Sequence, residues 1–286
     1  MPTSPRKRIL LTGGSGFVGR HLLERYGDRY RFFAPTHQQL DLTDAVAVAR
    51  FVEQYPVDLI VHTANIGGDA KTRNLQNIVE VNLRMFFSIA QLAPRVARII
   101  FLGSGAEYGK QADLIRVQEA QFGARVPSDS YGFYKYACSR FIETVDNIVN
   151  LRIFGLYGRY EDADIRFISK AILTGIRGES LTVYQNVRFE YMYITDFIAI
   201  VGHFIEHAPQ EKFYNMGVDD PVDLLTIVRE VEEVVGKKVA VSVAKPGMAN
   251  EYTCDNALLR RDLPELRFTD RRAAMAELYR WYKNQT

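Results

Sequence analysis

The chain has 286 residues, of which 47% are hydrophobic and 24% are charged, so it can bury the core of one large domain, or of a domain with a smaller lobe attached. Its 36 Lys and Arg residues nearly balance 34 Asp and Glu residues, and the positive charges are scattered along the chain. This composition excludes intrinsic disorder, and no basic face for nucleic acid is expected.

Cys138 and Cys254 are too few for a disulfide framework, and no Cys/His cluster has the spacing of a zinc site. We therefore expect no metal. The charged segment 1–8 is followed only by the short apolar run 9–11, far less than a signal peptide needs. No later stretch approaches the roughly 20 apolar residues of a membrane span. The sequence predicts a cytoplasmic protein with no membrane contact.

Short apolar runs alternate with amphipathic segments of helical length in the first half of the chain. This alternation is typical of βαβ units and predicts an α/β fold with a Rossmann-type, doubly wound parallel sheet. The expected strands are 9–12, 31–34, 59–62, 99–103 and 149–153, and the expected helices are 16–26, 45–54, 75–92 and 130–146.

After position 155 the alternation becomes less regular. Helices are expected near 165–175, 195–207, 224–235 and 271–283, and strands near 187–193, 213–216 and 239–243. These elements predict a first domain at 1–155 and a smaller lobe at 156–286, interleaved with the first.

The glycine-rich run 12–19 lies between the first predicted strand and the first predicted helix. Gly13 permits a tight turn, Gly16 lets the backbone approach a pyrophosphate, and Gly19 lets the helix pack closely on the strand. The start of the helix offers unpaired N–H groups to the phosphates. The run predicts dinucleotide binding, and the alternative is a glycine turn without a ligand. The candidate contacts are Gly13, Ser15, Gly16, Phe17, Val18 and Gly19.

The segment 32–39, at the end of the second predicted strand, contains no acidic residue. Folds that prefer NAD usually carry an acid there for the ribose hydroxyls, and its absence leaves room for a 2′-phosphate. His37 is placed to hydrogen-bond to such a phosphate, or it is a plain surface histidine. NADP(H) is therefore favoured over NAD(H).

Tyr131 and Lys135 are separated by one helical turn and share a face of the predicted helix. A tyrosine phenol titrates near pH 10, and a neighbouring ammonium lowers that pKa, so the pair suits proton transfer. The lysine can also bind the ribose of a nicotinamide. Ser104 follows the fourth predicted strand, at the sheet edge where such folds place their sites. An exposed helical pair is the alternative interpretation of Tyr131 and Lys135.

Several further segments resemble motifs of the extended short-chain dehydrogenase/reductase family, in the branch that acts on nucleotide-sugars. In chain order they are 12–19, 58–64, 81–82, 104–109, 151–158 and 188–196, with weaker matches at 214–217 and near Trp281. Their number and order make the resemblance specific.

The resemblance implies that Ser104, Tyr131 and Lys135 form a catalytic triad, and that Arg188 contacts the pyrophosphate of a nucleotide-sugar. Asn65 resembles a substrate-facing residue, although a loop turn is the more cautious interpretation. Further cofactor contacts are implied at Asp41, Leu42, Thr63, Ala64, Asn82, Tyr131 and Lys135.

Asp41 and Asp196 also have structural interpretations, as helix caps. Asp41 is equally suited to cap the helix at 45–54, and Asp196 is expected to cap the helix near 195. The resemblance also implies a homodimer formed through the helices at 75–92 and 130–146.

Departures from the family pattern narrow the reaction. Dehydratases of this family carry an Asp-Glu pair directly after the Ser or Thr, where this chain has Gly105 and Ala106. Glu107 comes one position too late, and on a strand-like segment it would point to the other side. Fucose-synthase-like members have a cysteine where this chain has Ala106, plus a later histidine that is missing between His62 and His203.

These departures favour simple reduction of a nucleotide-linked 4-keto-6-deoxy sugar by NADP(H). The enzymatic alternative is a nucleotide-sugar 4-epimerase with tightly bound NAD. A non-catalytic nucleotide-binding regulator is a third interpretation, against which the intact triad argues.

Overall fold

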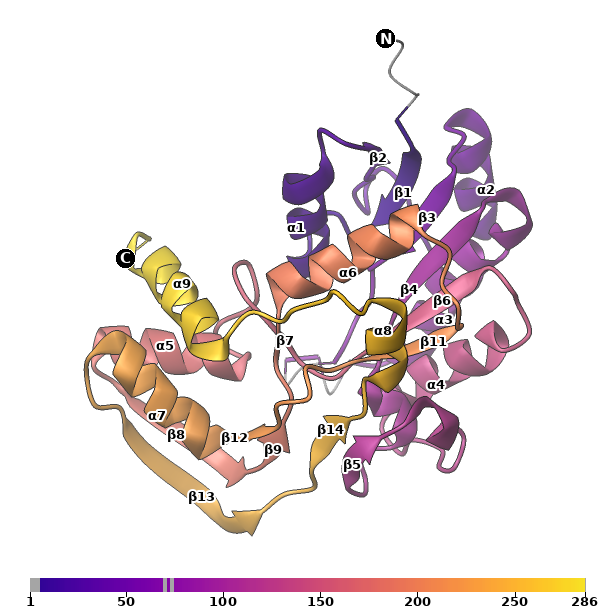
Figure 1. Ribbon diagram of the computed structural model, residues 1–286. Helices are drawn as coiled ribbons and strands as arrows, with labels where there is room; N and C mark the ends of the chain where they lie inside the picture. The colour runs from indigo at the N-terminus through magenta and orange to yellow at the C-terminus, as the bar shows by residue number, and fades with distance from the viewer. Residues whose placement is uncertain (1–5, 69–70, 73–74, 286) are drawn as a thin grey trace.

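The computed structural model describes residues 6–68, 71–72 and 75–285. A parallel sheet with the strand order β11-β6-β4-β3-β1-β2 lies at its centre (Figure 1). Its strands are β1 (Arg8–Thr12), β2 (Arg31–Phe33), β3 (Leu59–His62), β4 (Arg98–Ser104), β6 (Ile148–Ile153) and β11 (Phe213–Met216). The strands expected in the first half are confirmed, and β11 adds a strand from the second half to the same sheet.

Helices cover both faces of this sheet. Alternate strand residues belong to different core clusters, because successive side chains of a strand point to opposite faces. Ile9 and Leu11 pack on the face covered by α1 (Phe17–Tyr26) and α6 (Ile194–Glu206). Leu10 packs on the other face, which is covered by α2 (Ala45–Gln54), α3 (Ile78–Ala90) and α4 (Ser130–Ile142). The predicted doubly wound α/β fold is confirmed.

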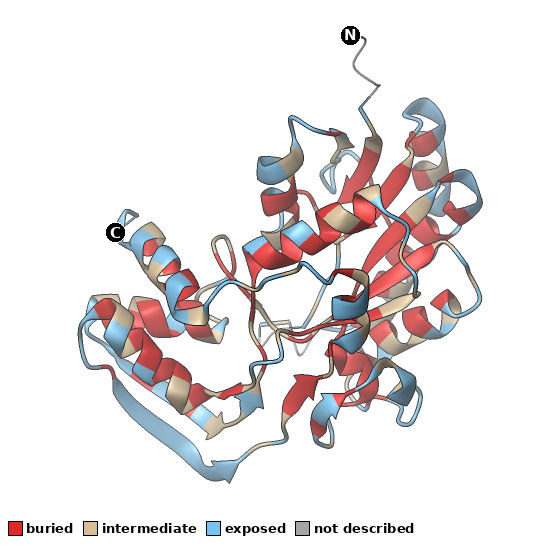
Figure 2. Cartoon of the chain, in the orientation of Figure 1, coloured by how far each residue is buried: buried red, intermediate tan, exposed pale blue. Residues whose placement is uncertain are grey.

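A smaller lobe follows the sheet. It contains α5 (Phe167–Arg177), α7 (Leu224–Val235) and α9 (Arg271–Lys283), together with the parallel pair β8 (Ser180–Asn186) and β13 (Ala240–Met248). Figure 2 shows that β13 is exposed along its length, and β8 is the only strand that pairs with it in the part of the chain that the structure describes.

A second sheet joins the two halves of the chain, in the order β12-β9-β14-β5. Its strands are β5 (Leu114–Val117), β9 (Arg188–Phe189), β12 (Val222–Asp223) and β14 (Tyr252–Cys254). Two-residue strands β7 (Leu156–Tyr157) and β10 (Met192–Tyr193) also pair, and α8 (Ala257–Asp262) follows β14. Because β5 pairs with β14, the first half of the chain contributes to the sheet of the second half.

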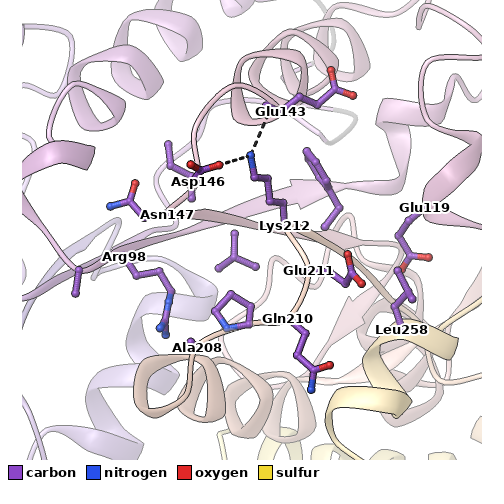
Figure 3. Close-up of a pocket in the computed structure, with 15 residues that line it drawn as sticks. Arg98, Glu119, Glu143, Asp146, Asn147, Ala208, Gln210, Glu211, Lys212 and Leu258 are labelled. Atoms are coloured by element: carbon purple, nitrogen blue, oxygen red, sulfur yellow. Dashed lines mark hydrogen bonds and ion pairs between the residues drawn. The ribbon is translucent and has the colours of Figure 1, made fainter.

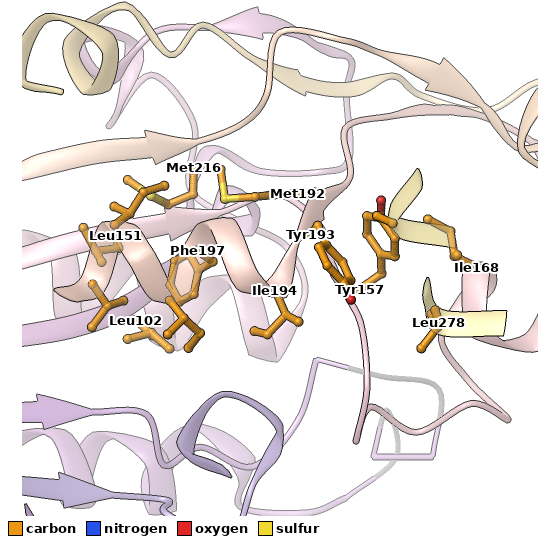
Figure 4. Close-up of a cluster of buried hydrophobic side chains, with 14 of the residues drawn as sticks. Leu102, Leu151, Tyr157, Ile168, Met192, Tyr193, Ile194, Phe197, Met216 and Leu278 are labelled. Carbon is orange, nitrogen blue, oxygen red and sulfur yellow. The ribbon is translucent and has the colours of Figure 1, made fainter. Parts of the chain in front are cut away.

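One hydrophobic cluster spans both halves (Figure 4). Leu102 and Leu151 enter it from the central sheet, Phe197 from α6, and Tyr157 and Leu278 from the lobe. The division into 1–155 and 156–286 remains a prediction, and the packing across it is continuous. In the described part of the chain, no helix has both the length and the apolar character needed to cross a bilayer.

Candidate active site

The carboxyl ends of the central strands bring the predicted site residues to one edge of the sheet. Thr12 ends β1, His62 ends β3 and Ser104 ends β4. The chain proceeds from β1 to β2 on one side and returns to β3 on the other, so the strand order reverses at this edge, and such folds bind their ligands at the point of reversal. Thr12 Oγ1 lies 2.7 Å from His62 Nδ1, and burial lowers the pKa of His62 to about 3. His62 is therefore a neutral, packed residue.

The glycine-rich loop has the shape of a phosphate cradle. Gly13 has φ of +69°, and a Cβ there would lie 2.6 Å from Thr63 Oγ1. A Cβ on Gly19 would overlap the carbonyl oxygen of Gly13, so α1 packs against the loop at backbone distance. Gly16 caps α1 without a side-chain hydrogen bond, which leaves the first N–H groups of the helix available. This geometry fits the diphosphate of a dinucleotide.

Ser15, Phe17 and Val18 occupy the mouth of this cradle. Ser15 is exposed and accepts a hydrogen bond from Arg20 Nε through its carbonyl oxygen, at 2.9 Å. Phe17 and Val18 are partly buried in the first turn of α1. Their backbone N–H groups belong to the first turn of α1, where helix N–H groups have no partner within the helix.

Asn82 and Thr63 shape the loop that follows β3. The buried Asn82 amide accepts from Ile66 N at 2.9 Å, and its Nδ2 donates to Ile66 O at 2.8 Å. Thr63 Oγ1 donates to Thr12 O at 2.7 Å, and Ala64 beside it is partly buried. The Asn82 side chain thus holds the loop in place, and its amide is occupied within the protein.

The region expected to face the adenosine half of the cofactor is open. His37 is exposed, whereas Leu42 is buried. The exposed Asp41 accepts hydrogen bonds from Thr43 N and Oγ1 at 2.9 and 2.8 Å, and these hold the pKa of Asp41 below its usual value. The alternative that Asp41 caps α2 is wrong, because Asp44 occupies that position and accepts from the first-turn N–H groups.

Ser104, Tyr131 and Lys135 come together where β4 meets α4. A side-chain hydrogen bond joins Tyr131 to Ser104. The buried Lys135 ammonium donates to Leu102 O and lies 4.5 Å from the ring centre of Phe101 and 5.9 Å from that of Tyr131. Asp129 caps α4 by accepting from Gly132 N at 2.8 Å, which fixes the helix that carries the pair.

The expected lowering of the Tyr131 pKa by Lys135 is wrong for this structure. Burial raises the pKa of Tyr131 to about 12, and the hydrogen bond with Ser104 only partly opposes that rise. The Lys135 ammonium is directed at the Leu102 carbonyl instead, and burial lowers the pKa of Lys135 to about 8. Tyr131 is therefore protonated at neutral pH and able to donate a proton.

Glu107 does not lie on a strand, as its position in the sequence suggested. Residues Gly105–Tyr108 form a short 3-10 helix, η2, which turns the Glu107 carboxylate back into the protein. One of its oxygens accepts from Ser104 N at 2.9 Å and the other from Arg152 Nε at 2.8 Å. Ser139 of α4 also donates to it. Glu107 thus fixes Ser104 relative to α4, and sequence reasoning missed this because the contact depends on η2.

Tyr252 of β14 was also missed. Its Oη lies 3.5 Å from Ser104 Oγ. Its ring packs against Phe154 and Phe189, with ring centres 4.9 and 5.1 Å away. A Cβ on Gly105 would lie 2.7 Å from the Tyr252 hydroxyl, so glycine is needed beside Ser104. No local pattern around Tyr252 indicated a strand that reaches the site.

The two predicted substrate contacts lie at the edges of this centre. Arg188 is exposed on β9, next to Phe189, and forms no ion pair with any residue that the structure describes. Asn65 is exposed, and its Nδ2 donates to Gly67 O at 3.2 Å. Its loop reaches the phenol, because a Cβ on Gly68 would lie 2.8 Å from Tyr131 Cε2.

Asp196 does not cap α6 as expected. It lies in the first turn of that helix, and its carboxylate accepts from Thr269 N and Oγ1 at 2.9 and 2.7 Å. Asp196 therefore ties the segment before α9 to α6.

A separate pocket of about 700 Å³ lies at the opposite edge of the sheet (Figure 3). It is lined by the starts of β4, β6 and β11, including Arg98 and Lys212. Lys212 Nζ pairs with Asp146 Oδ1 at 3.0 Å and donates to Glu143 O. None of the triad residues lines it, and the candidate active site lies at the carboxyl edge of the sheet.

A Rossmann sheet with a glycine cradle and a Ser/Tyr/Lys centre defines the class of nicotinamide-dependent oxidoreductases. Residues 9–217 match the NAD dependent epimerase/dehydratase family, and the chain belongs to that family. The predicted membership of the extended short-chain dehydrogenase/reductase family, in the branch for nucleotide-sugars, is confirmed. The prediction that the protein is an enzyme with a nicotinamide cofactor is confirmed as well.

Named relatives span most of the chain. GDP-L-colitose synthase of Yersinia pseudotuberculosis is 22% identical over 280 residues, covering 88% of this chain and 90% of the relative. GDP-L-fucose synthase of Azorhizobium caulinodans is 27% identical, covering 80% and 81%.

A solved structure of a GDP-D-glycero-L-gluco-heptose synthase from Campylobacter jejuni, in the presence of NADPH, has a TM-score of 0.86 at 16% identity, with all of both chains covered. UDP-glucose 4-epimerase of Thermotoga maritima has a TM-score of 0.84 at 16% identity, covering 97% of this chain and 99% of the epimerase. These likenesses show the shared fold.

Proposed function

We propose that the protein reduces the 4-keto group of a nucleotide-linked 4-keto-6-deoxy sugar, with NADP(H) favoured as the cofactor. The observation that carries this proposal is the meeting of Ser104, Tyr131 and Lys135 where β4 ends against α4, with the Lys135 ammonium 5.9 Å from the centre of the Tyr131 ring. The Tyr131 phenol, whose pKa burial raises to about 12, is protonated at neutral pH, which is the state that the reduction of a carbonyl requires.

The bound nicotinamide supplies the hydride. Ser104 hydrogen-bonds to the substrate oxygen and polarises the carbonyl, and Tyr131 donates its Oη proton to that oxygen. The Lys135 ammonium, fixed between Leu102 O and the ring of Phe101, is available to the ribose hydroxyls and holds the ring in place. Reduction needs no further acid or base.

Glu107 supports reduction over dehydration. Both of its carboxylate oxygens accept hydrogen bonds from internal donors, and its side chain is completely buried. It therefore cannot reach a substrate to remove a proton. Gly105 and Ala106 next to it carry no titratable group.

The preference for NADP(H) is supported by the end of β2. A Cβ on Gly14 would lie 2.9 Å from Ala34 Cβ, which puts the end of β2 against the glycine cradle. His37 follows shortly and is exposed, and no acid between 32 and 39 would repel a 2′-phosphate.

A nucleotide-sugar substrate is supported by Arg188 and by the names of the relatives. Arg188 is exposed on β9, a strand of the second sheet that pairs with β14, the strand carrying Tyr252. Its guanidinium, with no ion pair among the described residues, suits a diphosphate. The relatives named above are synthases of GDP-sugars.

The test is a panel of nucleotide 4-keto-6-deoxy sugars assayed with NADPH and with NADH. We expect loss of reduced-nicotinamide absorbance and a hydroxy sugar by NMR, at a higher kcat/KM with NADPH. A 4-epimerase, the alternative function, would need the same three residues, Ser104, Tyr131 and Lys135. Purified protein that retains NAD and interconverts nucleotide-sugars without consuming reduced nicotinamide would replace the reductase proposal with that function.

A further inference from the structure

The Ser104 hydroxyl lies between two phenols. Tyr131 of α4 is joined to it by a hydrogen bond, and Tyr252 of β14 places its Oη 3.5 Å from Ser104 Oγ. Tyr252 belongs to the half of the chain that forms the smaller lobe, whereas Tyr131 belongs to the Rossmann half. Each half of the molecule therefore contributes one tyrosine that contacts the Ser104 hydroxyl.

A count of donors and acceptors fixes the direction of these bonds. A serine hydroxyl has one proton and two lone pairs. Ala106 N donates to Ser104 Oγ at 3.2 Å and occupies one lone pair. If Ser104 donated to Tyr252, the buried Tyr252 proton would have no acceptor among the described residues, which is costly. In the opposite arrangement it is the Tyr131 proton that lacks an acceptor within the protein, and this costs less because Tyr131 is only partly buried. The arrangement in which Tyr252 donates to the second lone pair is therefore favoured.

We propose that Tyr252 is a positioning residue for Ser104. Its Oη–H occupies the last acceptor site of the Ser104 hydroxyl, so that the one Ser104 proton is directed at Tyr131 in the free enzyme and at the substrate oxygen once the substrate is bound. This role rests on the proposed reductase function, and it is not assigned by membership of the family.

The surroundings of Tyr252 hold its hydroxyl in this place. Its ring is 6% exposed and is packed between Phe154 and Phe189. Backbone pairing of β14 with both β9 and β5 fixes the strand. Gly105 leaves room for the hydroxyl, since a Cβ there would lie 2.7 Å from it. The phenol thus has little freedom to find another partner.

A double-mutant cycle tests the proposal with wild type, Tyr252→Phe, Ser104→Ala and the double variant. Tyr252→Phe keeps the ring and removes only the oxygen. We expect it to lower kcat roughly 10-fold with little change in KM, because an orienting hydrogen bond is lost. In the Ser104→Ala background the same change should have no further effect, because no hydroxyl remains to be oriented.

Tyr214→Phe is the matched control. Tyr214 is also a buried phenol, and its Oη donates to Asp262 away from the triad, so kcat should be unchanged. An unaltered kcat in Tyr252→Phe, or an equal loss in both backgrounds, overturns the proposal. If wild type reduces no nucleotide keto sugar, the proposed function fails. In that case the free energies of unfolding of the same four proteins test the contact. If the losses in the two single variants add up in the double variant, the Ser104–Tyr252 hydrogen bond is refuted.

Discussion

Tyr131 is the residue on which the proposed chemistry depends most. Tyr131→Phe removes the proton donor and should lower kcat by about 10²- to 10⁴-fold, the usual contribution of a general acid. Steady-state kinetics with the keto sugar measures this loss, and the melting temperature should change little.

Tyr134→Phe in the same helix is the control for that variant. The Tyr134 hydroxyl is buried and has no hydrogen-bond partner among the described residues, so its removal should leave kcat intact and the protein equally or more stable. If Tyr134→Phe were as inactive as Tyr131→Phe, the assignment of Tyr131 as the proton donor would be contradicted.

The low pKa of Lys135 gives a pH dependence. Burial lowers that pKa to about 8, so the ammonium is charged below pH 8 and loses its proton above it. We expect kcat/KM for reduction to fall as pH rises through about 8, because the free enzyme then loses its cation. In Lys135→Arg this inflection should disappear, since a guanidinium stays charged. An inflection that persists in Lys135→Arg would assign it to another group.

Sequence spacing could find Ser104, Tyr131 and Lys135, because one strand end and one helical turn determine where they lie. It could not find Glu107 or Tyr252. The first reaches Ser104 through a 3-10 turn, and the second comes from a strand far along the chain. The direction of the Tyr131 pKa was also missed, because burial, which depends on tertiary packing, outweighs the nearby ammonium.

The turn between β1 and α1 depends on Gly19. A Cβ at this position would overlap the Gly13 carbonyl and lie 2.6 Å from Gly14 Cα. Gly19→Ala should therefore push α1 away from the cradle, lower the free energy of unfolding by about 2 kcal/mol and weaken dinucleotide binding. Urea unfolding and cofactor titration measure the two effects.

Gly175→Ala in α5 is the matched control. Its Cβ would meet only side-chain methyl groups of Val239 and Val235, at 3.3 to 3.4 Å, and alanine favours a helix. Dinucleotide affinity should stay at the wild-type value. Equal effects of the two variants would contradict the close-packed role of Gly19.

The element pattern was predictable where buried strands alternate with amphipathic helices. The strands β1, β3 and β4 carry continuous apolar runs, so their positions follow from composition. The short strands β5 and β14 have no such pattern, and they form through tertiary pairing, β5 with β14 and β14 also with β9. Strand β8 also lacks a continuous apolar run, and only Leu181 and Val183 are buried in it.

The assembly of the whole molecule remains a prediction. Helices α3 and α4 carry Phe87 and Phe133, which are 44% and 42% exposed although both are large and apolar. We expect them to be buried in a homodimer. Phe87→Glu should give a monomer by light scattering, whereas Tyr184→Glu on β8, at a site 74% exposed, should not change the mass. A wild-type monomer would refute the dimer.

The molecule as a whole unites a cofactor cradle from the first half with Arg188 and Tyr252 from the second. In the proposed reaction, one hydride passes from the nicotinamide to carbon 4 of the sugar. The most direct measurement is a turnover with NADPH carrying deuterium in the transferred position, followed by NMR of the product. We predict one deuterium at carbon 4 and one NADP⁺ formed per sugar. Product without deuterium, formed with no net oxidation of NADPH, would contradict the account.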